Sequence, residues 1–195
     1  MNAISNAIQE SPVRPALMTH TIAGFPSFSE SKEVVRMMDE VGADIIEIQI
    51  PFSDPVADGP TMMRCNEIAI DRGFRVENAF KMAQELSSEI STPLLFMTYY
   101  NIVFKRGVEK FCREAREVGI QGVIVPDMPP EEEKTEHFLE ACQKKVCVGF
   151  PLFRPLLRQS ALLFLHNMQV DFGMWFLARE SPVRKTIFLK RQMKK

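Results

Sequence analysis

Two acidic residues in the first third of the chain have the surroundings of an acid–base pair. Glu47 lies inside the isoleucine-rich run 45–50, and Asp58 follows in a turn-rich loop. A carboxylate within an apolar strand is costly unless it is paired, protonated or used. Burial among isoleucines raises the pKa of such a carboxyl, whereas a polar loop lets the other stay ionised. The pair therefore predicts proton transfer near neutral pH.

Each acid also has a structural interpretation. Glu47 could be a buried carboxylate paired with a lysine or arginine, and Asp58 could be a simple turn residue. Asp54 stands directly before Pro55, which favours a turn over a catalytic role. The histidines, scattered at positions 20, 137 and 166, receive no role.

Strand and helix patterns alternate around this loop. Apolar, β-branched runs predict strands over 16–22, 45–50, 93–98 and 122–125, and a fifth begins at 146–150. Helical spacing of apolar residues covers 29–41, 61–71, 76–90, 108–118 and 131–144. This alternation implies right-handed βαβ units around a parallel sheet, as in a barrel or a doubly wound fold. The polar loops follow strand ends, where α/β folds place their active sites.

A short motif occurs twice, each time between a helix pattern and a strand pattern. The tripeptide Glu-Val-Gly occupies residues 40–42 and again residues 117–119. We interpret both glycines as helix ends that lead straight into a strand.

The alternation ends after Lys145. Residues 151–195 hold nine lysines and arginines against two acids, although the 195-residue chain has a net charge of −1. We interpret residues 1–150 as part of one α/β domain and residues 151–195 as an atypical basic tail of uncertain structure. The change of composition near Val146 suggests a shifted reading frame or an internal deletion. A basic tail can indicate a nucleic-acid partner, but this one belongs to no recognised nucleic-acid-binding fold, so none is expected.

Composition narrows the class of protein. With 46% hydrophobic and 25% charged residues, the chain has the balance of a soluble globular protein. No apolar stretch is long enough to span a bilayer, and the first ten residues do not resemble a secretory signal. The four cysteines form no CxxC pair and no zinc spacing, which favours reduced thiols in a cytoplasmic protein without a metal site.

Four motifs, in matching order and spacing, resemble the tryptophan synthase alpha-subunit family. They are TIAGFP at 21–26, IQIPFSDPVADGPT at 48–61, MTYYN at 97–101 and VPDMPPEE at 125–132. The resemblance covers about residues 14 to 145 and implies a (β/α)8 TIM barrel. About five βα units are present, and the glycine-rich phosphate turns of the family's later strands have no counterpart, so we expect a chain truncated after about residue 145.

The resemblance implies a carbon–carbon lyase of L-tryptophan biosynthesis. The family cleaves indole-3-glycerol phosphate to indole and glyceraldehyde 3-phosphate by a retro-aldol reaction. By the same resemblance, Glu47 protonates indole C3 and Asp58 acts at the indole nitrogen. Three residues match the substrate pocket: Tyr99, Met97 and Ile124. Tyr99 could equally be an ordinary core aromatic.

The family also works with a partner. Its beta subunit carries PLP and completes a heterotetramer, so the resemblance implies no cofactor in this chain. Four residues match loops that face the beta subunit: Asp54, Pro55, Asn101 and Pro129. The alternative is a catalytically inactive remnant that at most binds the beta subunit.

Two residues beside the acid pair depart from the family pattern. Gln49 stands where the family usually has glycine, and we expect it to crowd the floor of the pocket. His20 stands where an aromatic residue usually lines the pocket.

Overall fold

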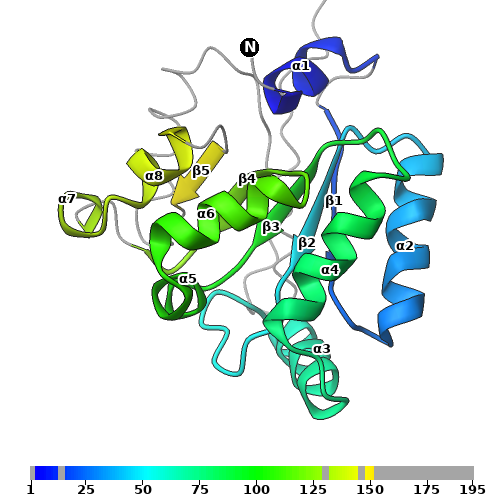
Figure 1. Ribbon diagram of the computed structural model, residues 1–195. Coiled ribbons are helices and arrows are strands. Elements are labelled where there is room, and N and C mark those ends of the chain that lie inside the picture. Colours follow the sequence, from blue (N-terminus) through cyan, green and yellow to red (C-terminus); the bar gives the residue numbers. More distant parts are fainter. Residues whose placement is uncertain (1–2, 13–15, 129–131, 145–147, 152–195) are drawn as a thin grey trace, which may run out of the picture.

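The computed structural model describes residues 3–12, 16–128, 132–144 and 148–151. Its centre is one parallel sheet in which each strand pairs with the next along the chain, in the order β1-β2-β3-β4-β5 (Figure 1). The strands are β1 (Met18–Ile22), β2 (Ile45–Gln49), β3 (Leu94–Met97), β4 (Ile120–Val125) and β5 (Val148–Pro151). A doubly wound sheet would reverse its strand order, whereas sequential order is that of a barrel wall. The described strands therefore form the predicted part of a (β/α)8 barrel.

Helices cover one face of this sheet. Those that pack there are α2 (Phe28–Glu40), α4 (Val76–Ser87), α6 (Val108–Glu117) and α8 (Phe138–Lys144). The remaining helices are α1 (Ala3–Glu10), α3 (Pro60–Asp71), α5 (Tyr100–Arg106) and α7 (Glu133–Glu136). Figure 1 shows α1 at one end of the sheet and α3 and α5 at the other. The helix layer leaves the second face of the sheet as the interior wall of the barrel.

Strand β2 is buried on both faces, as its isoleucine run predicts. Ile46 and Ile48 belong to the core between sheet and helices. Ile45 belongs to a second core on the interior face, which α1 closes with Ile4 and Ile8. Each fully buried isoleucine contributes about 1.5–3 kcal/mol, so the two cores hold this strand in place.

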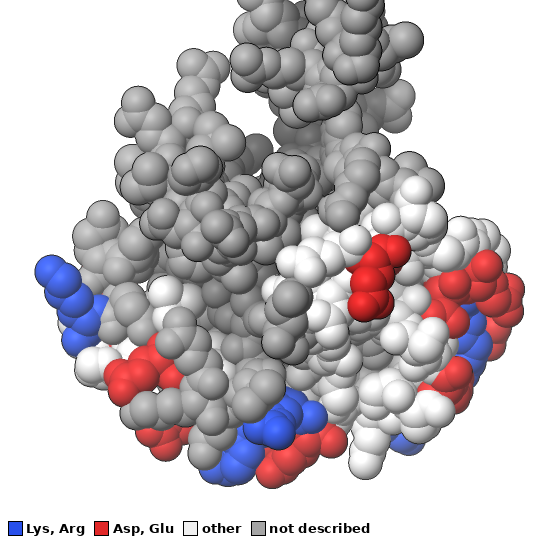
Figure 2. Space-filling view, turned by 90° about the horizontal axis from the view of Figure 1, so that it is seen from above, with Lys and Arg blue, Asp and Glu red and all other residues white. Residues whose placement is uncertain are grey.

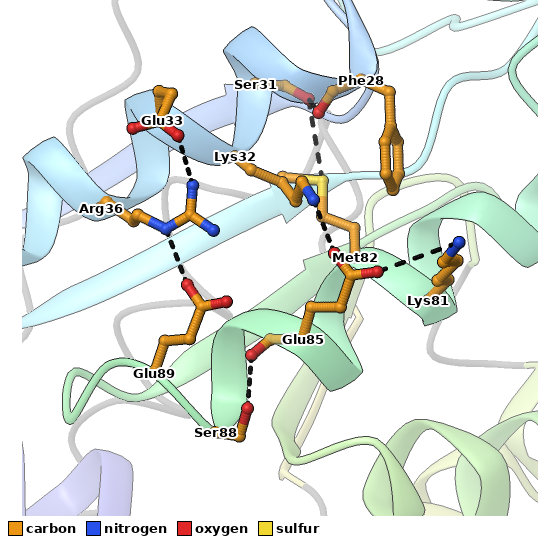
Figure 3. Close-up of polar contacts among 10 residues, drawn as sticks. All are labelled: Phe28, Ser31, Lys32, Glu33, Arg36, Lys81, Met82, Glu85, Ser88 and Glu89. Atoms are coloured by element: carbon orange, nitrogen blue, oxygen red, sulfur yellow. Dashed lines mark hydrogen bonds and ion pairs between the residues drawn. The ribbon is translucent and has the colours of Figure 1, made fainter.

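Helices α2 and α4 lie side by side and are joined by ion pairs (Figure 3). Lys32 Nζ lies 2.6 Å from Glu85 Oε2, and Arg36 Nε lies 2.7 Å from Glu89 Oε2. These pairs lower the pKa of both glutamates through the hydrogen bonds that they accept. Because the carboxylates face solvent, screening keeps their contribution to stability small, and the buried side chains beneath them hold the two helices together.

Two short helices escape prediction from the sequence pattern. Helix α1 has only eight residues, and its two isoleucines become an apolar face only because the interior core receives them. Helix α5 follows Tyr99, whose side chain forms no cap hydrogen bond. Instead Asp127 Oδ1 accepts the Tyr100 N–H at 2.8 Å from the end of β4. This cap comes from a distant segment, so local patterns could not reveal it.

Other boundaries differ from the prediction as well. The single helix predicted over 131–144 is interrupted at His137, whose φ is 52°, and the described part forms α7 and α8. The fourth strand begins at Ile120 rather than at residue 122. The predicted tail lies outside the described residues from position 152 onward.

Seen from the α1 end, charges of both signs alternate along the outer edge of the described surface (Figure 2). On this face the described residues form no patch of one sign. Nor does any helix among them have the length and apolar character needed to cross a membrane.

The repeated tripeptide ends two helices in the same way. Gly42 follows α2 and Gly119 follows α6, with φ values of 83° and 87°. Each N–H donates to a carbonyl of the preceding turn, Asp39 for Gly42 and Arg116 for Gly119. The predicted helix ends are thus confirmed, because a positive φ suits glycine far better than any other residue.

The two glycines differ in the space around them, which makes a matched pair of substitutions. A Cβ at residue 119 would lie 2.4 Å from Ser87 Cβ, whereas one at residue 42 would meet nothing within 4 Å. Gly42→Ala should cost about 1 kcal/mol of unfolding free energy through its φ alone. Gly119→Ala should cost about 3 kcal/mol, because overpacking adds to the strain. Urea unfolding measures both, and equal losses would contradict the contact with α4.

Candidate active site

The interior face carries the predicted acid/base residue. Glu47 is 7% exposed, and its neighbours in register are His20 on β1 and Leu95 on β3. His20 Nδ1 lies 2.8 Å from Glu47 Oε1. Among the described residues, the ion-pair partner of Glu47 is therefore a histidine and not a lysine or arginine.

The next row on the same face holds two of the predicted substrate residues. Gln49 pairs in register with Met97, and Met97 pairs with Ile124. Both apolar side chains are nearly buried and belong to the interior core. The structure thus places Met97 and Ile124 one row beyond Glu47, towards the carboxyl ends of the strands.

Asp58 is held in place by amide groups from two elements. Its Oδ2 accepts from Gln49 Nε2 at 2.7 Å and from Asn66 Nδ2 at 3.1 Å. Asn66 is fully buried on α3, and its Oδ1 accepts the Phe52 N–H at 3.2 Å. One asparagine therefore fixes both ends of the loop after β2, including the carboxylate that the loop carries.

The environment of Asp58 is less polar than its loop position suggests. Burial raises the pKa of Asp58 above its ordinary value, although Gln49 and the charge of His20 act in the opposite direction. Asp58 therefore ionises in the folded protein at a cost, and that cost is reduced by the two amide donors.

Tyr99 closes the loop from the side of β3. It is fully buried, its hydroxyl accepts the Ala57 N–H at 3.2 Å, and its ring stacks on Phe52 with centroids 5.2 Å apart. Burial and the charge of Asp58 raise the pKa of Tyr99 well above its ordinary value, so the phenol stays neutral. Tyr99 is thus a core aromatic that also holds the Asp58 loop against the interior face.

The residues predicted to face a partner have different surroundings. Asp54 is exposed and accepts from Ser53 Oγ at 2.5 Å, as befits a turn. Asn101 is exposed in the first turn of α5 rather than in a loop. Pro55 is buried, and Pro129 lies outside the described residues.

Three functional residues were missed or underrated by sequence reasoning. His20 received no role, Gln49 was expected only to crowd the pocket, and Asn66 was not noticed. The alternation of side chains along the first strand could have placed His20 on the interior face. That His20 lies directly opposite Glu47 becomes visible only once the two strands are paired. Asn66 could have been found as an amide side chain on the buried side of a predicted helix, where it needs a hydrogen-bond partner.

The arrangement is suited to proton transfer. Within the described part of the chain, no group of three or more His, Cys, Asp and Glu side chains could hold a metal ion. The two carboxylates have different environments, because Glu47 lies in the middle of β2 and Asp58 lies on the loop that follows this strand. The apolar side chains of Met97 and Ile124 lie on the same face in the next row.

Comparisons with known proteins find relatives of one family. The family model described as tryptophan synthase alpha chain matches residues 6–168, which extends past residue 145, the limit of the resemblance drawn from the sequence. The tryptophan synthase alpha chain of Desulforapulum autotrophicum is 39% identical over 87% of this chain and 66% of its own length.

Solved structures give the same result. One from Aquifex aeolicus is 40% identical with a TM-score of 0.71, and the match covers 76% of this chain and 59% of that one. One from Pyrococcus furiosus, described as a tryptophan synthase a2b2 complex, is 34% identical with a TM-score of 0.65, covering 69% and 53%. This chain spans about half the length of the curated relatives it matches.

Substitution of Asp58 tests how the site affects stability. The raised pKa means that the folded state binds the Asp58 proton more tightly than the unfolded state does. The resulting cost is therefore absent below the unfolded pKa and present at neutral pH. Asp58→Asn should raise the free energy of unfolding by about 1 kcal/mol at pH 7 and change it little near pH 3.

Urea unfolding at the two pH values measures this difference. Asp54→Asn, in the exposed part of the same loop, is the matched control and should alter stability little at either pH. A loss of stability at pH 7 in Asp58→Asn would show that the carboxylate stabilises the fold.

Proposed function

Because the chain belongs to the tryptophan synthase alpha chain family, we propose that it is a lyase that cleaves indole-3-glycerol phosphate to indole and glyceraldehyde 3-phosphate. The observation that carries this proposal is the shared face of Glu47 and Asp58. Glu47 lies in the middle of β2, and Asp58 hydrogen-bonds Gln49 in the next row, which also holds Met97 and Ile124. That combination supports proton transfer on an aromatic substrate.

The reaction requires two proton movements. Cleavage adds a proton to indole C3 and removes one from the glycerol hydroxyl, which becomes the aldehyde carbonyl. Glu47 is the group that we assign to C3, because it is the carboxyl group on the strand itself. The carboxylate left after that transfer is assigned to accept the hydroxyl proton, so Glu47 ends the reaction in its starting state. Asp58 is assigned to the indole N–H, since its amide donors favour the carboxylate and a carboxylate can stabilise charge at that nitrogen.

The apolar row positions the indole ring in this proposal. Met97 and Ile124 supply contact area without polar atoms, and Tyr99 keeps the Asp58 loop at the fixed distance that the nitrogen requires. Proton transfers alone carry the chemistry, so the proposal calls for no cofactor in this chain.

We also propose a PLP-dependent beta subunit as the partner, in a cytoplasmic heterotetramer. A related structure is described as an a2b2 complex, which supports this partner. The exposed side chains of Asp54 and Asn101 are available to contact it. Pro55 shapes this surface from beneath, because it is buried, and Pro129 is assigned by resemblance alone.

Glu47→Gln tests the lyase proposal. The amide keeps the size of the side chain but cannot exchange a proton, so indole release from indole-3-glycerol phosphate should fall about 10²–10⁴-fold. Indole is measured with purified chain in the presence of an added beta subunit. The matched control is Glu40→Gln, an exposed glutamate at the end of α2, which should leave the rate unchanged.

Two results would contradict the proposal. Equal rates for Glu47→Gln and the unsubstituted chain would remove Glu47 from the chemistry. No indole from a folded chain would mean that the catalytic residues remain without the activity, and co-purification with the beta subunit would then test whether binding alone persists.

A further inference from the structure

His20 is the side chain that contacts the proposed acid/base group. It faces Glu47 directly across the β1–β2 pair, with 2.8 Å between Nδ1 and Oε1. The side chain of His20 is 31% exposed and that of Glu47 is 10% exposed, so water screens the contact only partly. Hydrogen bonds that involve an ionised partner in such a setting are the strong ones.

The direction of the hydrogen bond between His20 and Glu47 follows from the chemistry of the carboxylate. When Glu47 is ionised its carboxylate can only accept, and Nδ1 then donates its hydrogen to Oε1. Among the residues that the structure describes, none is seen to hydrogen-bond the other oxygen, Oε2. The histidine therefore takes one oxygen of Glu47 and leaves the second available for a substrate.

The imidazole also feels the charge of the second carboxylate, Asp58. His20 Nε2 and Gln49 Oε1 are both buried and have no hydrogen-bond partner among the described residues. In a protonated ring Nε2 carries a hydrogen and is a donor, and the side-chain carbonyl of Gln49 is an acceptor. The amide nitrogen of the same Gln49 donates to Asp58. Burial lowers the pKa of His20, but the hydrogen bond and charge of Glu47, the charge of Asp58 and Gln49 together raise it above 6.5.

We infer that His20 is a positioning residue that holds Glu47 by one carboxylate oxygen and acts as the shared counter-ion of Glu47 and Asp58. A protonated imidazole attracts both carboxylates, Glu47 through the direct contact and Asp58 through its charge. The orientation of Glu47 and the charge of the pair would then both depend on one histidine. This inference rests on the proposed function for its catalytic consequence, but the His20–Glu47 pair itself can be measured without any turnover.

The pair is tested first by titration. The imidazole protons of His20 are followed by NMR across pH 5 to 9 and assigned by their absence in His20→Asn. Glu47→Gln removes the charge of Glu47 and its charged hydrogen bond, both of which raise the pKa of His20. The titration midpoint of His20 should therefore fall by about one pH unit or more. His137, an exposed histidine 3.0 Å from Glu140, is the internal reference and should not move.

The catalytic role is tested by two substitutions of different chemistry. His20→Leu removes the donor and should lower kcat about 10²-fold with little change in KM, because Glu47 loses its orientation. His20→Asn places an N–H near the position of Nδ1 and should recover most of that loss at pH 7. His137→Asn is the matched control on the surface and should leave both constants unchanged.

The two arms separate failure of the inference from failure of the proposed function. An unchanged His20 midpoint in Glu47→Gln, or an undiminished kcat in His20→Leu, would overturn the inference even in an active lyase. If the unsubstituted chain releases no indole, the proposed function fails, and the titration alone then decides whether His20 and Glu47 form the pair.

Discussion

The structure depends on one constraint, the burial of polar side chains on a strand that is covered on both faces. Strand β2 places Glu47 and Gln49 among isoleucines, where an unpaired carboxylate or amide would cost several kcal/mol. The surroundings provide the partners: His20 for the carboxylate and Asp58 for the amide. The arrangement of the site is thus largely the set of partners that these two side chains require.

Those partners come from separate parts of the chain. Asn66 contributes from α3, and Tyr99 contributes from the end of β3 and fixes the Ala57 N–H. Asp127 begins α5 from the end of β4 by the same kind of contact. The loops at the carboxyl ends of the strands are therefore held by side chains of neighbouring βα units, and a barrel wall brings those units together in chain order.

The site also has a cost that the rest of the fold must offset. Asp58 and His20 both bind protons more tightly in the folded state, so both contribute less stability as pH rises through their folded pKa values. Two large apolar cores, one on each face of the sheet, provide the stabilisation that makes this acceptable. Such a balance between activity and stability is common where a site needs charged groups that are partly buried.

The sequence alone determined the alternating βα pattern, the doubly buried second strand, the glycine ends at residues 42 and 119, and the positions of Glu47 and Asp58. These are local features, since hydrophobic periodicity and turn residues act over a few neighbours. Only the tertiary structure decided the sequential strand order, helices α1 and α5, and the roles of His20 and Asn66. Each of these depends on contacts between segments far apart in the chain, which strand pairing and packing create and no local pattern encodes.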